Sequence, residues 1–156
     1  MDPGSRATGY GVIDQRGNEL FFVACGVIRT TPDLSFPERL QELHSGITEV
    51  IATHRPQQAA VEEIFTAVNP RSALKLGHAR GVLILALMQA ALPVAQFTPM
   101  VVKQAVAGYG RAPKEQVQQM VRSLLHLSAS PSQDAADALA VAICLANHAV
   151  VLPRKP

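Results

Sequence analysis

The sequence contains no tryptophan, and aromatic residues make up only 4% of its 156 positions. A folded core must therefore consist mainly of leucine, valine, isoleucine and alanine, which the 48% hydrophobic fraction can supply. Charged residues are also few, at 17%, and this apolar composition excludes a disordered chain. The net charge of +2 permits a nucleic-acid partner but does not indicate one. The length favours a single domain, residues 1–156.

Cysteine motifs, secretory signals and long apolar runs are absent as well. Cys25 and Cys144 lie far apart without a CxxC spacing, which argues against a disulfide framework and a zinc site. No apolar stretch follows a basic start, so a secretory signal is not expected. The continuous apolar run from Val82 to Met88 is far shorter than the roughly 20 residues of a membrane-spanning helix. We therefore expect a cytoplasmic protein.

The order of the predicted elements favours an α/β fold with an open mixed sheet and helices on its faces. Residues 9–30 predict a three-stranded β-meander that bends near Gly26. The helix predicted after Asn69 is apolar nearly all round and is expected to be central. Ser35 with Glu38 and Ser130 with Gln133 form patterns typical of capping boxes. Further strands are expected at 59–65 and 94–97, and helices at 36–55, 70–92, 98–106, 113–127 and 131–148.

Four acidic residues stand where an isolated charge is costly. Asp2 opens the chain before a Pro-Gly turn, and Glu62 interrupts the apolar strand expected at 59–65. Asp134 and Asp137 lie three apart near a helix start, and therefore on one face, among alanine and leucine. Ionised carboxylates in apolar surroundings need a partner, and Mg²⁺ prefers carboxylate oxygens. Two such ions about 4 Å apart can activate water and stabilise the leaving oxygen of a phosphodiester.

Each acid also has a simpler explanation when it is taken alone. Asp134 could be a solvated residue that the helix dipole favours. Glu62 could be a charge on an edge strand, and Asp2 could be an ordinary turn residue. The metal-site hypothesis therefore depends on the four carboxylates meeting in space.

Four blocks of sequence, spread over nearly the whole chain, together carry a specific resemblance. They are Asp2-Pro3-Gly4-Ser5 with Thr8-Gly9-Tyr10-Gly11, Ala60-Val61-Glu62-Glu63-Ile64-Phe65, Asn69 with Ser72-Ala73-Leu74-Lys75-Leu76-Gly77 and Ala79-Arg80-Gly81, and Asp134-Ala135-Ala136-Asp137-Ala138-Leu139-Ala140. In order and spacing these blocks resemble the RuvC family of bacterial Holliday-junction resolvases.

The resemblance implies a ribonuclease-H-like fold, with a mixed five-stranded sheet and helices on both faces, and a homodimer. It implies a crossover junction endodeoxyribonuclease that resolves four-way DNA junctions in recombination and repair by symmetric hydrolysis of two strands. Two Mg²⁺ ions per subunit are implied, with Mn²⁺ as a substitute. Asp2, Glu62, Asp134 and Asp137 match the catalytic, metal-binding acids, so Glu62 rather than Glu63 faces the metals. RuvA and RuvB, the branch-migration proteins, are the partners that the resemblance implies.

The resemblance also suggests which residues contact DNA. Lys114 sits at a predicted helix start, where backbone N–H groups favour phosphate. The candidate DNA-binding residues are Phe65, Lys75, Arg80, Lys103 and Lys114. Lys75 and Arg80 could instead be solvated helix surface, and Phe65 could be a core residue.

The sequence departs from the family at its first residues. Family members usually carry a short apolar strand before the Asp-Pro-Gly turn, whereas Asp2 follows Met1 directly. We expect a slot in the sheet and an Asp2 held only by a frayed terminus. A dimer that binds junctions but is catalytically impaired is therefore one alternative. Asp-x-Gly also opens actin-like ATPases and sugar kinases, but those folds need two domains and a much longer chain.

Overall fold

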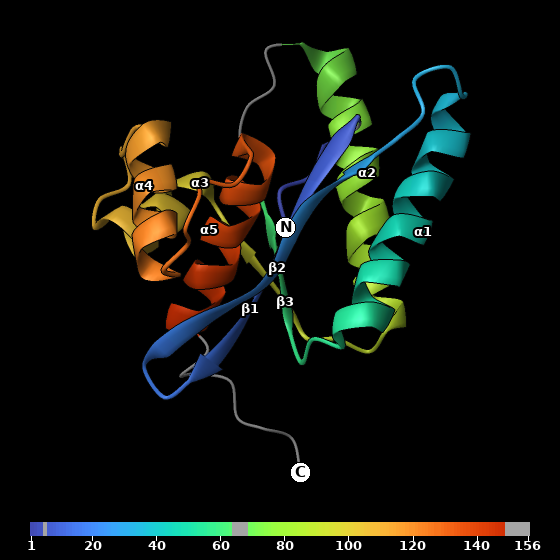
Figure 1. The fold of residues 1–156 in the computed structure, drawn as a ribbon. Helices are drawn as coiled ribbons and strands as arrows, with labels where there is room; N and C mark the ends of the chain where they lie inside the picture. Colours follow the sequence, from blue (N-terminus) through green and yellow to red (C-terminus); the bar gives the residue numbers. More distant parts are fainter. Residues whose placement is uncertain (5, 64–68, 149–156) are drawn as a thin grey trace.

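A computed structural model describes residues 1–4, 6–63 and 69–148 of the chain (Figure 1). The elements in chain order are β1 (Ala7–Arg16), β2 (Glu19–Arg29), α1 (Phe36–His54), β3 (Ala59–Glu62), α2 (Pro70–Gln89), β4 (Val94–Phe97), α3 (Pro99–Ala107), α4 (Lys114–Leu124) and α5 (Gln133–His148). The strands lie between two groups of helices, with α1 and α2 on one side and α3, α4 and α5 on the other (Figure 1). This arrangement confirms the predicted α/β layering.

The described strands form two pairs that the first two residues connect. β1 pairs antiparallel with β2, and β3 pairs parallel with β4. The amino group of Met1 donates to the carbonyl of Ala60 at 2.8 Å, and Asp2 exchanges two backbone hydrogen bonds of 3.1 Å with Gly9. Met1 and Asp2 thus lie between β3 and β1, where a central strand was expected to leave a slot.

The hairpin of β1 and β2 corrects the predicted three-stranded meander. β2 continues through Gly26 to Arg29, and the register of the pair shifts between Val12 and Ile13 of β1, opposite which Val23 of β2 is left without a partner residue in the pairing. Gly26 leaves room for the ring of Tyr10, since a Cβ there would stand 2.7 Å from the hydroxyl of Tyr10. The sequence signal at Gly26 therefore marks a close contact with a side chain rather than a strand end.

The helix starts follow their capping signals, with one exception. Ser35 and Glu38 form the predicted capping box of α1, and the Asn69 side chain caps α2 by accepting from the Arg71 N–H at 2.8 Å. The box predicted at Ser130 is wrong, because α5 begins only at Gln133. The carbonyl of Ser132 accepts the bond from Ala136, at 2.8 Å, that defines the N-cap position.

The central helix is α5 rather than α2, which corrects the sequence-based expectation. Ten residues of α5 are buried, against four of α2. Leu74, Leu85 and Met88 of α2 remain 66%, 54% and 57% exposed, although they are apolar. The apolar residues of α2 therefore lie partly in the core and partly on an exposed face of the helix. None of the helices among the described residues combines the length and hydropathy that crossing a membrane requires.

Candidate functional site

Asp2 and Glu62 come together because Met1 lies directly beside the end of β3. The N–H of Glu62 donates to the carbonyl of Met1 at 3.0 Å, and the carboxyl groups of Asp2 and Glu62 share a hydrogen bond. Burial, and then the charge of Asp2, raise the pKa of Glu62 to about 7. Burial, followed by the charge of Asp137, also raises the pKa of Asp2. The charge of the Met1 amino group acts against both rises, but the pKa of each carboxyl group stays above its ordinary value.

The α5 helix brings the other two acids to the same place. Burial raises the pKa of Asp137, while the ammonium group of Lys114, 3.6 Å away, and the charge of Lys103 act against this rise. The charge of Asp134 raises the pKa of both Asp2 and Asp137. The predicted convergence of the four carboxylates is thus visible in their mutual electrostatic effects.

Two glycines of β1 allow α5 to approach closely enough. A Cβ on Gly9 would stand 2.0 Å from the backbone oxygen of Asp134. A Cβ on Gly11 would stand 2.8 Å from the backbone nitrogen of Leu139. Two glycines two apart in a strand point to one face, so the spacing was a readable signal that our sequence analysis did not use.

Gly9 also holds Asp2. Both backbone hydrogen bonds of Asp2 go to Gly9, and the same glycine lies against Asp134 of α5. The expectation that Asp2 would depend on a frayed terminus is therefore wrong, because its main chain is paired on both its N–H and its carbonyl. Asp2, Glu62 and α5 meet around one residue of β1.

The donor set fits a hard divalent cation in chemistry. The side chains are all carboxylates, and the pKa values of Asp2, Glu62 and Asp137 are raised by burial and by one another's charge, which a cation would offset. Within residues 1–4, 6–63 and 69–148, no three histidine, cysteine, aspartate or glutamate side chains stand in a ready ligand arrangement. Binding a cation therefore requires these side chains to turn toward it.

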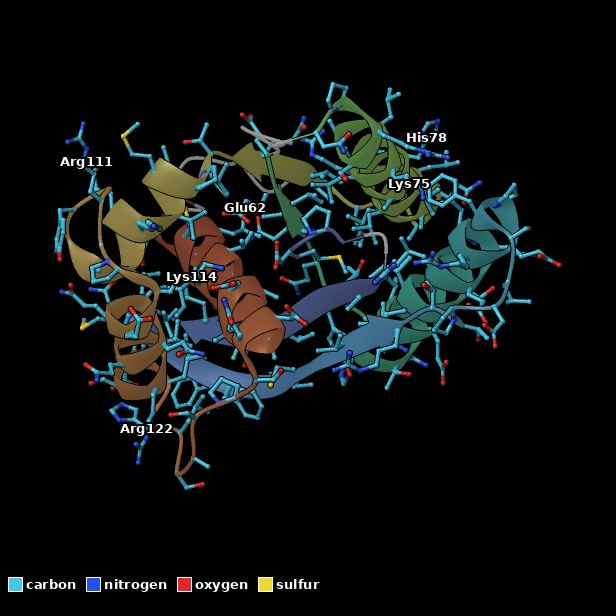
Figure 2. All side chains as sticks on the ribbon, turned by 90° about the horizontal axis from the view of Figure 1, so that it is seen from above. Glu62, Lys75, His78, Arg111, Lys114 and Arg122 are labelled. Carbon is cyan, nitrogen blue, oxygen red and sulfur yellow. The ribbon has the colours of Figure 1, made fainter. Side chains whose placement is uncertain are left out.

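The candidate DNA-binding residues occupy different surroundings. Lys114 lies on the α4 side of Glu62, and Lys75 lies on the α2 side (Figure 2). The ammonium group of Lys75 is 5.7 Å from the ring centre of Phe36. Lys103, on α3, is close enough to Asp137 to lower the pKa of that carboxyl group. Arg80 bonds to the backbone of Glu62. Phe65 lies outside the described residues.

The metal-free protein is expected to lose stability as the pH rises from about 5 to about 6, because above pH 6 the buried Met1 amino group, whose pKa is lowered to about 6, acts in the opposite direction. The pKa of Glu62 is about 7 in the folded protein, whereas an unfolded chain restores its ordinary value near 4.5. Between these values the folded protein holds a proton that the unfolded chain releases, so a higher pH favours unfolding. The melting temperature in EDTA should fall over this range, and Glu62→Gln should flatten the fall.

The matched control for this experiment is Glu63→Gln, which removes the neighbouring carboxylate of the same strand end. It should leave the pH dependence close to that of the unaltered protein. A melting temperature that rises steadily between pH 5 and pH 6, with or without Glu62, would contradict the raised pKa.

Comparison with known proteins identifies the relatives of this chain. The family model for crossover junction endodeoxyribonuclease RuvC matches residues 1–145. The crossover junction endodeoxyribonuclease RuvC of Polynucleobacter asymbioticus is 54% identical over 97% of this chain and 88% of its own. That of Cupriavidus metallidurans is 55% identical over 94% and 81%. The structure of T. thermophilus RuvC in complex with Holliday junction substrate has 39% identity and a TM-score of 0.89, covering 95% of this chain and 91% of that one.

The fold, with acids from three separate segments meeting beside its strands, is that of the ribonuclease-H-like class. Within this class the sequence matches are specific and extend over most of the chain and of its relatives. The chain belongs to the RuvC family of crossover junction endodeoxyribonucleases.

Proposed function

We propose that this chain is a structure-selective endonuclease that resolves four-way DNA junctions by symmetric hydrolysis of two phosphodiester bonds. The observation that carries the proposal is the meeting of Asp2, Glu62 and Asp137, each with a raised pKa, beside Lys114. Family membership supports the same activity, because the relatives are named crossover junction endodeoxyribonucleases. A four-way junction as substrate is supported by the related T. thermophilus complex.

Asp2, Glu62, Asp134 and Asp137 are the residues proposed to hold two divalent cations per subunit, Mg²⁺ or Mn²⁺. When bound, such ions activate water and stabilise the departing oxygen of a phosphodiester. The raised pKa values of Asp2 and Glu62 favour a proton on the pair, and a bound cation would favour its release. Lys114 forms an ion pair with Asp137, the charge of Lys103 acts on the same carboxyl group, and both lysines could attract the phosphate of the DNA strand. The protein thus prepares the charges of the site before the DNA binds.

The experiment that tests the function is a cleavage assay on a four-way junction with and without Mg²⁺. A three-way fork and a linear duplex are the substrate controls, and Asp134→Asn is the enzyme control. We expect paired nicks in the junction alone, only with Mg²⁺, and only with Asp134 intact. Equal cutting of the linear duplex would refute the structure-selective function. Binding without any cutting would favour the catalytically impaired alternative, which the firm pairing of Asp2 argues against.

A homodimer is the proposed assembly, because two equivalent sites suit two equivalent cuts in a pseudo-symmetric junction. The proposed contact is an exposed stripe on α2, which is spaced by three and four residues and therefore follows one helix face. Its members are Leu74, Gly77, Gly81, Leu85 and Met88. A Cβ on either glycine would meet nothing within 4 Å among the described residues, so a second helix could approach closely there.

Leu85→Glu is expected to convert the dimer to a monomer, because it places a charge in the middle of the proposed α2 contact. Sedimentation velocity would measure the change, and paired nicking of one junction should give way to single nicks. Val23→Glu is the matched control, since Val23 is 47% exposed on β2. A Leu85→Glu protein that sediments as the unaltered protein does would contradict the α2 contact.

The partnership with RuvA and RuvB stays a prediction of the family resemblance. A cytoplasmic location stays a prediction as well, and it agrees with a DNA substrate.

A further inference from the structure

Arg80 lies in the middle of α2, and its guanidinium group is engaged within the protein. Its Nε donates to the backbone oxygen of Glu62 at 3.1 Å, and its Nη2 donates to Oε1 of Gln96. Gln96 belongs to β4, the parallel neighbour of β3. One planar group therefore joins α2, the end of β3 and β4, in a geometry that only a forked donor provides.

The carbonyl of Glu62 needs this donor because its position in the strand ladder has none. Met1 donates to Ala60 and accepts from Glu62, which is the alternation of a parallel ladder. The next donor in that ladder, aimed at the carbonyl of Glu62, is the N–H of residue 3. Residue 3 is proline, which carries no N–H. The ladder therefore stops at the peptide that carries the acidic site.

We infer that Arg80 is a positioning residue: it replaces the N–H that Pro3 lacks and holds the last peptide of β3 in place. The inference rests on the proposed nuclease function. The side chain of Glu62 departs from this peptide toward Asp2, so fixing the peptide fixes the direction of the carboxylate. Figure 2 shows Glu62 between the α2 side of the molecule and the α4 side that carries Lys114. Arg80 thus links the helix of the proposed dimer contact to the acid that must meet Asp2 and α5.

A positioning role and a DNA contact respond differently to a substitution that keeps the charge. Lysine retains the attraction for phosphate but cannot bridge two acceptors as the guanidinium fork does. We expect Arg80→Lys to leave junction affinity within about twofold and its salt dependence unchanged. The turnover of the bound junction should fall about 10- to 100-fold, as is typical when support for a metal ligand is lost. Arg71→Lys, on the same helix, is the matched control and should leave both unchanged.

A second measurement needs no DNA. Mn²⁺ binding to the protein, followed by electron paramagnetic resonance, should weaken roughly tenfold in Arg80→Lys. Full turnover and full Mn²⁺ affinity in this variant would overturn the inference. Arg80→Ala separates the two roles further, since a DNA contact would lower junction affinity and reduce the salt slope by about one. Lower junction affinity of Arg80→Ala, together with normal turnover of the bound junction, would also overturn the inference.

The Pro3→Ala substitution tests the replaced hydrogen bond directly, because alanine restores an N–H at residue 3. When Pro3→Ala is combined with Arg80→Lys, we expect the double variant to recover part of the Mn²⁺ affinity and part of the melting temperature that Arg80→Lys alone loses. Purely additive effects of the two substitutions on melting temperature would refute the replacement. If the unaltered protein neither cuts junctions nor binds Mn²⁺, the proposed function fails, while this coupling still decides whether Arg80 replaces the N–H.

Discussion

Glu62→Gln is expected to lower junction cleavage in Mg²⁺ by roughly 10³-fold, which corresponds to about 4 kcal/mol of activation free energy. Glutamine keeps the size of the side chain but cannot supply a charged ligand oxygen. Burial and the charge of Asp2 raise the pKa of Glu62 to about 7, so its ionised form is disfavoured in the folded protein. The fold should therefore tolerate an uncharged glutamine. Junction binding should remain, because less negative charge faces the phosphates.

The control for this prediction is the adjacent residue. Neighbouring side chains of an extended chain point to opposite sides, so Glu63→Gln should cleave within a few fold of the unaltered protein. Rates measured on a prebound junction separate catalysis from binding. Comparable losses in both variants would show that charge near the end of β3, rather than a specific ligand, matters.

Gly9→Ala is expected to cause the largest loss among the non-acidic positions. Its new Cβ would stand 2.0 Å from the backbone oxygen and 2.7 Å from the backbone carbon of Asp134. Backbone atoms in a central helix cannot move aside as a flexible side chain does, so α5 must shift away from β1. We expect a loss of about 3 kcal/mol or more in the free energy of unfolding. The melting temperature should fall by about 10 °C.

Cleavage by Gly9→Ala should fall by at least about 100-fold, because a misplacement of about 1 Å at a catalytic group has that effect. The assay must run well below the melting temperature of the variant, with circular dichroism to show that it is folded. Gly17→Asn is the matched control in the same hairpin. Gly17 has a φ of 62°, which asparagine tolerates, and a Cβ there would meet no atom of the described part of the chain within 4 Å. A Gly9→Ala protein that melts and cuts normally would contradict the contact between β1 and α5.

Both predictions arise from the same feature, which is the assembly of one acidic centre from separate segments. Glu62 ends β3, Asp2 pairs with Gly9, and Asp134 lies against the same glycine at the start of α5. A change in any of these contacts alters the distances between carboxylates that belong to different elements. The scaffold is therefore as important for the proposed catalysis as the acids are.

Local signals in the sequence were reliable where short-range chemistry decides the outcome. The capping box at Ser35 and the Asn69 cap mark their helices because each satisfies backbone N–H groups within a few residues. The resemblance identified the four acids by their neighbours along the chain. Two predictions were wrong. Gly26 does not end a strand but lies against the Tyr10 side chain, and Ser130 does not cap α5, which begins at Gln133.

The sequence by itself determined the α/β class and most helices and strands, and it indicated the four acids proposed for the site, because these depend on periodicity and on motifs. Only the tertiary structure decided that α5 is central and that α2 keeps an exposed apolar stripe, since the neighbours of each helix determine which face is buried. It also decided that Arg80 faces Glu62. That contact joins residues 18 apart in sequence. We infer that it replaces the N–H that Pro3 lacks, and this lack matters only because Met1 lies beside β3.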